Sequence, residues 1–119
     1  MREDTVRYMM IAKANARSES GAPPSPEIMA KMGQLIEEMT KAGKLILTGG
    51  LLPSSQGIRV TSSGGKITFT DGPFTEAKEM IAGFAIFELA SKEEAKEISR
   101  RFWEINGDGE GEIRPMMTR

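Results

Sequence analysis

Residues 70–79 read Thr-Asp-Gly-Pro-Phe-Thr-Glu-Ala-Lys-Glu and lie between two strand-like segments. Asp71 can accept hydrogen bonds from the backbone ahead of it, Gly72 permits positive φ, and Pro73 fixes φ near about −65°. These three residues predict a turn. Four charged side chains occur within the ten residues, which a turn alone does not require. The stretch is therefore also the first candidate for a functional site.

The segment before this turn has the pattern of a β-hairpin. Residues 58–61 and 66–70 alternate apolar with polar side chains on either side of Ser62-Ser63-Gly64-Gly65. Alternation with a period of two is typical of a strand that buries one face. The sequence predicts a hairpin at about residues 57–70, with one face buried and with Asp71-Gly72-Pro73 closing it.

Four further strands and two helices are predicted on either side. Strands are expected at residues 6–14, 45–48, 83–89 and 112–117, with a break or bulge at Gly49-Gly50, and loops at residues 15–24 and 53–57. One helix begins after Ser25-Pro26, where the hydroxyl caps and Pro occupies the first turn. The second begins at a capping box from Ser91 to Glu94. The expected apolar faces of the helices are Ile28, Met32, Leu35, Ile36 and Met39, then Ala95, Ile98, Phe102 and Ile105.

Without the hairpin, the element order is β-α-β-β-α-β. This order predicts an α+β, ferredoxin-like domain with two helices on one face of an antiparallel sheet. One domain is expected over residues 1–119, with its core at about residues 6–117. The strands hold more apolar residues than one helical layer covers: Met9 or Met10, Phe84, Ile86, Ile113 and Met116. We therefore expect a homodimer whose sheets face each other, in a dimeric α/β-barrel-like assembly.

The composition excludes several kinds of chemistry. The net charge of −1, without a basic cluster, argues against nucleic acid as a partner. The chain has no cysteine and no histidine, which removes disulfides, thiolates and the usual base near neutral pH. The nine methionines are expected to pack, so no metal or other cofactor is predicted. No signal peptide or membrane span is found, and the expected location is the cytoplasm.

Five segments together resemble the DGPF subgroup of YCII-related proteins. They are Asp71-Gly72-Pro73-Phe74 with residues 75–79, Arg7 to Ile11, Gly49-Gly50-Leu51-Leu52-Pro53, Ile81-Ala82-Gly83-Phe84, and Glu112-Ile113-Arg114-Pro115. The resemblance spans about residues 6–117 and implies a ferredoxin-like dimer with a cleft between sheet and helices. It also implies a functional link to extracytoplasmic-function sigma factors.

The resemblance bears on catalysis as well. Some YCII-related proteins have a His–Asp pair, and one branch resembles a dehydrochlorinase of muconate-type compounds. Asp71 is the counterpart of that Asp, whereas no residue of this chain takes the place of the His. Asp71 is thus either a general acid or base whose pKa is raised by burial, or a turn residue bonded to the backbone of Phe74 or Thr75.

The remaining candidate residues have two interpretations each. Glu76, Lys78 and Glu79 either line a polar pocket, with Lys78 holding an organic anion, or form solvated ion pairs. Arg114 either clamps a carboxylate or pairs with Glu112 or Asp71 to fix the dimer. Tyr8 is either a hydroxyl donor in the cleft or a core residue.

The sequence therefore leaves two functions open. The first is a dimeric small-ligand-binding or regulatory protein. The second is a cofactor-independent lyase or isomerase acting on a small organic anion, with Asp71 as acid or base and with Arg114, Lys78, Glu76 and Tyr8 around the ligand.

Overall fold

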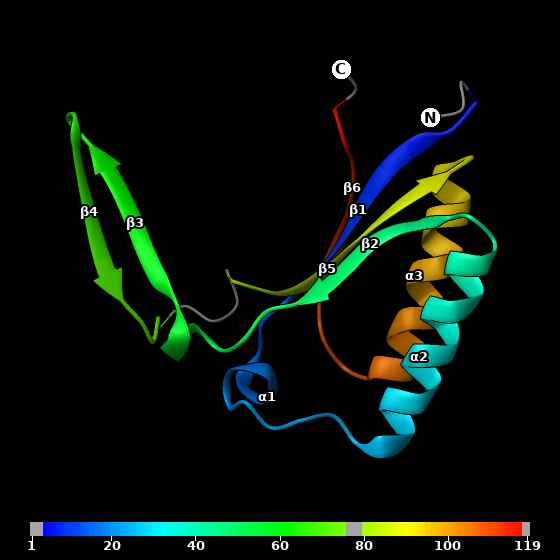
Figure 1. Ribbon diagram of the computed structural model, residues 1–119, viewed down its shortest axis with the longest axis horizontal. Helices are drawn as coiled ribbons and strands as arrows, with labels where there is room; N and C mark the ends of the chain where they lie inside the picture. Colours follow the sequence, from blue (N-terminus) through cyan, green and yellow to red (C-terminus); the bar gives the residue numbers. More distant parts are fainter. Residues whose placement is uncertain (1–3, 76–79, 118–119) are drawn as a thin grey trace.

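The protein is seen here in a computed structural model that describes residues 4–75 and 80–117. A four-stranded sheet has two long helices on one face, and a separate two-stranded hairpin stands on the other side of the sheet (Figure 1). The elements are β1 (Val6–Lys13), α1 (Ala16–Glu19), α2 (Pro26–Lys41), β2 (Leu45–Gly50), the 3₁₀ turn η1 (Ser54–Gln56), β3 (Ile58–Ser63), β4 (Lys66–Asp71), β5 (Ile81–Leu89), α3 (Lys92–Asn106) and β6 (Gly111–Pro115). No helix in the described part of the chain could span a membrane.

The four-stranded sheet has the order β2-β5-β1-β6, and each neighbouring pair is antiparallel. This mixed α+β arrangement is consistent with the expected ferredoxin-like fold. Tyr8 pairs with Phe87, and both are buried, so the even-numbered residues of β1 face the helices. Met9, which pairs with Ile86, lies on the opposite face, called here the open face.

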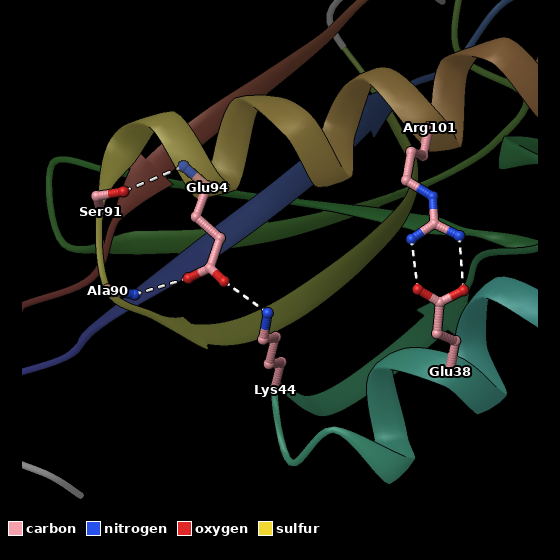
Figure 2. Close-up of polar contacts among 6 residues, drawn as sticks. All are labelled: Glu38, Lys44, Ala90, Ser91, Glu94 and Arg101. Carbon is pink, nitrogen blue, oxygen red and sulfur yellow. Dashed lines mark hydrogen bonds and ion pairs between the residues drawn. The ribbon is translucent and has the colours of Figure 1, made fainter.

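Both long helices begin where their capping residues predict. The Ser25 hydroxyl accepts a hydrogen bond from the Ile28 N–H, and Pro26 is the first residue of α2. The Ser91 hydroxyl accepts from the Glu94 N–H at the start of α3, while the Glu94 carboxylate accepts from the Ala90 N–H (Figure 2). The predicted reciprocal capping by Ser91 and Glu94 is therefore present, and the bond to the Glu94 carboxylate comes from Ala90, the residue before the N-cap.

The predicted apolar faces of the helices pack on the sheet. Leu35 and Met39 of α2, together with Ala95 and Ile98 of α3, are buried. They form one core cluster with three side chains of the sheet: Tyr8, Phe87 and Leu89. Burial of a large apolar side chain contributes about 1.5–3 kcal/mol, so this layer is the main source of stability.

Ion pairs join α2, and the short connection between α2 and β2, to α3 (Figure 2). Both guanidinium nitrogens of Arg101 donate to the Glu38 carboxylate at 2.6 and 2.7 Å, and Lys44 Nζ lies 2.6 Å from Glu94 Oε2. The hydrogen bonds from Arg101 lower the pKa of Glu38, and those to Glu38 raise the pKa of Arg101. The two helices are thereby held together near the end of the sheet that contains the core cluster.

The structure corrects the predicted hairpin. β3 and β4 pair with each other alone, and every residue of both strands is exposed. The prediction of one buried face was wrong because the hairpin does not fold back on the helices or the sheet (Figure 1). Its connection is Gly64-Gly65, with both glycines at positive φ, while Asp71 is the last residue of β4.

Four smaller predictions also change. The expected loop at residues 15–24 contains the short helix α1, whose capping box joins Asn15 and Ser18. The expected loop at residues 53–57 contains η1. Gly49 and Gly50 continue β2 to its end, and the register shift lies earlier, between Leu45 and Leu47. Ile113 faces the helices, because it pairs with Met10.

Candidate functional site

The structure places the predicted site residues in different surroundings. Asp71 lies at the base of the hairpin, is exposed, and pairs through its backbone with Ile58. Its carboxylate makes no hydrogen bond or ion pair with another described residue. The N–H of Phe74 donates to Ser54 Oγ, so the predicted bond from Phe74 to Asp71 is not formed.

Tyr8 and Arg114 belong to the four-stranded sheet but to opposite faces of it. Tyr8 is 5% exposed and belongs to the core cluster. This position agrees with the second of its two interpretations, a core residue. Arg114 pairs with Met9 across β6 and β1 and is exposed on the open face. Its expected partner Glu112 lies near Lys13, at 3.9 Å.

Glu76, Lys78 and Glu79 lie outside the described residues. Their role in a polar pocket thus remains a prediction. Among the described candidates, Asp71 belongs to the two-stranded sheet, and Arg114 and Tyr8 belong to the four-stranded sheet. The structure therefore does not gather these three residues in one site within a single chain.

The signature turn is instead built around Ser54, which is buried. The Ser54 hydroxyl donates to Glu19 Oε1 and accepts from the Phe74 N–H at 3.0 Å, and the Ser54 N–H donates to Glu19 Oε2 at 2.9 Å. The Ser54 hydroxyl, followed by its N–H, lowers the pKa of Glu19. This cluster, which we call the Ser54 junction, connects α1, η1 and the turn after β4.

Gly72 and Phe74 close the same junction. The Gly72 N–H donates to the Gly57 carbonyl at 2.9 Å, and a Cβ atom at Gly72 would overlap the Ser54 carbonyl oxygen. Arg59 of β3 lies over the Phe74 ring, 4.4 Å from its centroid, in cation–π geometry. The sequence Asp-Gly-Pro-Phe therefore has a structural role here, which is to join the hairpin to the rest of the domain.

A separate cavity of about 520 Å³ lies between the helices and the sheet. From the sheet it is lined by residues that include Ala12, Gly50, Gly83 and Ala85. Met32, Leu35, Ile36, Phe102 and Trp103 are among the helix residues that line it. Pockets that bind small molecules have this size, about 300–1,000 Å³, and mostly apolar walls.

The register of the sheet explains why the cavity exists. Gly50, Gly83 and Ala12 pair in one cross-strand row, and because none of them has a side chain larger than a methyl group, the space below the helices is left unfilled. At the other end of the sheet, the corresponding row contains Phe87 and Tyr8, which fill that space. The cavity thus follows from a change of side-chain volume along the strands.

Trp103 forms the wall of the cavity near the end of α3. Its ring lies edge to face with Phe102, with the ring centroids 5.0 Å apart. The connection to β6 approaches this ring closely, since a Cβ atom at Gly109 would lie 2.6 Å and one at Gly111 2.9 Å from ring carbons. The glycines after α3 therefore let the connection pack on the indole.

Few polar groups line the cavity. Thr48, Ser99 and Asn106 contribute them, whereas the Glu112 side chain lies on the open face, because Glu112 pairs with Ile11 and its carboxylate lies 3.9 Å from Lys13 Nζ. The Thr48 hydroxyl already donates to the Phe84 carbonyl at 3.0 Å. These walls suit a molecule that is mostly apolar and has one or two polar groups.

Sequence reasoning missed both the Ser54 junction and the cavity walls. Glu19 and Ser54 are far apart in the sequence, and no short motif connects them. A signal for the cavity was present in Gly49-Gly50 and Ala82-Gly83, where small residues interrupt two neighbouring strands. Their alignment across the sheet is visible only from the register.

The comparison with known proteins gives the family. The sequence matches the YCII-related domain over residues 6–117. The chain belongs to the YCII-related family. It is also similar to an uncharacterised protein of Rhizobium meliloti (strain 1021), with 31% identity over 90 residues, which cover 75% of this chain and 73% of that protein. The two segments that supply the small residues of the cavity, Gly49-Gly50 and Ala82-Gly83, lie within the matched range.

Proposed function

We propose that this YCII-related protein is a homodimer that binds a small, mostly apolar molecule in the cavity between its sheet and its helices. The observation behind the proposal is the cavity itself, which has a volume of about 520 Å³ and lies beside the core cluster. A void of this size lined by apolar groups lowers stability when it is empty. A bound molecule would recover those contacts.

The lining indicates the class of ligand. Phe102 and Trp103 offer aromatic surfaces, and Met32 offers an adaptable thioether. No Lys or Arg is among the described residues that line the cavity, so a negatively charged ligand would lack a partner there. A neutral ring compound fits these walls better than the organic anion expected from the sequence.

The enzymatic alternative has less support. General acid–base catalysis needs the reacting group within about 2.6–3.2 Å of its substrate, and a pocket to hold that substrate. Asp71 is exposed on the hairpin and does not line the cavity. A lyase or isomerase based on Asp71 would require a second chain to complete its site, so ligand binding is the better-supported function.

The open face of the sheet supports the homodimer. Its centre contains Met9, Ile86 and, on the exposed edge strand, Leu47, and Leu47 is 53% exposed. Exposed apolar patches of this kind mark interaction surfaces. The face also contains Glu88 Oε1, which is buried, lies 3.7 Å from Arg7 Nε, and has no hydrogen-bond partner among the described residues. Facing sheets would bury the apolar centre and offer that oxygen a donor.

The assignment to the DGPF subgroup also belongs to this proposal. It rests on Asp71-Gly72-Pro73-Phe74 and on the packing of Gly72 and Phe74 in the Ser54 junction. The link to a sigma factor stays a prediction from the resemblance.

Amide chemical shifts measured during a titration with indole test the ligand site. We expect shifts at Gly49, Gly83 and the Trp103 indole N–H, with a Kd on the order of 0.1–1 mM for so small a ligand. Ala85→Leu should abolish them, because the larger side chain projects from the sheet into the space that indole would occupy. Ala30→Leu adds the same atoms on the exposed surface of α2 and should leave the shifts unchanged.

Benzoate provides the opposite test in the same experiment. If benzoate rather than indole binds, and if the shifts lie around Asp71 or Arg114, the apolar site is wrong and the organic-anion function is favoured. If neither probe shifts Gly49 or Gly83, the cavity is not a ligand site.

A further inference from the structure

The hairpin has a mostly apolar face that no described part of its own chain covers. Val60 pairs with Phe69, and Ile58 and Ile67 share their side of the two strands. Their pairing partners Asp71 and Ser62 lie at the two ends of the same face. The four apolar side chains are 59–70% exposed. The opposite side holds polar residues: Arg59, Thr61, Ser63, Lys66, Thr68 and Thr70. The hairpin is therefore amphipathic, which is the pattern of a two-stranded sheet that packs on something.

A hairpin in this state is an incomplete structure. An isolated two-stranded sheet is marginally stable at best in water. β3 and β4 pair only with each other, and the Ser54 junction holds only their base. Another body must cover the apolar face if the hairpin is to stay ordered.

The accessible surface of the chain is larger than that of a compact monomer of the same mass. The chain exposes 8612 Å², whereas a folded monomer of this mass exposes about 6,300 Å². The radius of gyration is 16.1 Å, compared with about 13.5 Å for a compact chain of this length. The excess of roughly 2,300 Å² equals what each chain of a large obligate dimer buries, about 1,000–2,500 Å².

The position of the hairpin indicates which body covers it. Figure 1 shows the hairpin on the side of the four-stranded sheet that faces away from α2 and α3. This is also the side of the open face, with Met9 and Ile86. One neighbour that packs on the open face would thus lie next to the hairpin. In a two-fold dimer the same surface of each chain is buried, so both chains lose the same amount of exposed area.

We infer that the β3–β4 hairpin is a clasp that packs its apolar face, Ile58, Val60, Ile67 and Phe69, on a second copy of this chain. The inference rests on the proposed homodimer and adds that the β3–β4 hairpin contributes to its interface. The open faces form the centre of the interface, and the two hairpins close over the partner at its edges.

The absence of native cysteine allows a direct test. Val60→Cys places a thiol on the apolar side of β3, and Thr61→Cys places one on the polar side, next to it. The rate of thiol modification by dithionitrobenzoate is measured for both full-length variants at several protein concentrations, with the mass followed by sedimentation. Where the chain is dimeric, we expect the Val60→Cys thiol to react at least ~10-fold more slowly than the Thr61→Cys thiol, with the rates converging as dilution dissociates the dimer.

The possible outcomes separate the clasp from the dimer. Equal rates in a dimeric protein overturn the clasp and leave the dimer intact. Protection that persists in the monomer shows that the chain covers its own hairpin, which also overturns the clasp. A chain that is monomeric at all concentrations, with equal rates, overturns both. As a second readout, Phe69→Ser should raise the dimer Kd at least ~10-fold and Thr68→Ser should not; an unchanged Kd for Phe69→Ser contradicts the clasp.

Discussion

Ser54 is the residue at which three separate parts of the chain meet. Its hydroxyl and N–H bind both oxygens of Glu19, and its hydroxyl also accepts the N–H of Phe74. The side chain is buried, so each of these groups depends on it for its partner. At the residue scale, the turn that the sequence singles out is organised by a serine twenty residues away.

Ser54→Ala should lower the free energy of unfolding by about 1–3 kcal/mol, because it leaves the partly buried Phe74 N–H without its acceptor. Urea unfolding followed by circular dichroism measures the change. Ser55→Ala, at the exposed neighbouring position, is the matched control and should change stability by less than about 0.5 kcal/mol. Equal effects of the two substitutions would contradict the junction.

Glu19 gives the same junction a pH dependence. Its pKa is lowered in the folded state by the Ser54 hydroxyl and N–H. A carboxylate with a lowered folded pKa stabilises the protein above its unfolded pKa, about 4.3, and loses this effect as the pH falls through the folded pKa. Wild type should therefore exceed Glu19→Gln in unfolding free energy near pH 7, and the difference should shrink near pH 2.

The measurement is urea unfolding at a series of pH values. Glu110→Gln serves as control, since Glu110 is exposed and forms no ion pair among the described residues. A difference between wild type and Glu19→Gln that grows as the pH falls would refute the assigned role of Glu19.

At the scale of elements, the connection between the hairpin and the domain depends on a close backbone contact. Gly72 is the residue that makes this contact possible, because any side chain there would overlap the Ser54 carbonyl. The Gly72 N–H also donates to the carbonyl of Gly57, the residue between the 3₁₀ turn and β3. The direction in which the hairpin leaves the domain is thus fixed at its base.

Gly72→Ala should destabilise the protein by more than about 2 kcal/mol, since the overlap is with backbone and requires a shift of the junction. Gly33→Ala is a matched glycine replacement inside α2, where a Cβ atom meets nothing within 4 Å. It should raise stability by about 0.5–1 kcal/mol. Thermal unfolding distinguishes the two, and similar melting temperatures would contradict the close contact.

The helices and most of the strands could be predicted from local sequence patterns. The helix caps Ser25 and Ser91 and the alternation in the strands are local signals, and they predicted the helix starts, most strand positions and the two apolar helix faces. The exposed hairpin was mispredicted because alternation indicates that one face is apolar without saying what covers it. The cavity and the Ser54 junction depend on register and on contacts between distant residues, such as Glu19 with Ser54, which no local pattern encodes.

At the scale of the whole molecule, the single chain leaves two apolar surfaces open on one side of its sheet. We expect a sedimentation mass of twice 13.0 kDa at micromolar concentration. Ile86→Lys should raise the dimer Kd by at least about 100-fold, because it places an unpaired charge in the centre of the interface.

Ala30→Lys adds the same charge on the exposed surface of α2 and should leave the mass unchanged. A wild-type chain that sediments as a monomer, or an Ile86→Lys variant that stays fully dimeric, would contradict the facing sheets.

The most direct test of the central claim compares the cavity with the signature turn in one calorimetric titration. Indole is titrated into wild type, Ala85→Leu and Asp71→Asn. We predict that binding is lost in Ala85→Leu and kept within about twofold in Asp71→Asn, because Asp71 does not line the cavity. Binding that survives Ala85→Leu but disappears in Asp71→Asn would place the site at the signature turn and contradict the account.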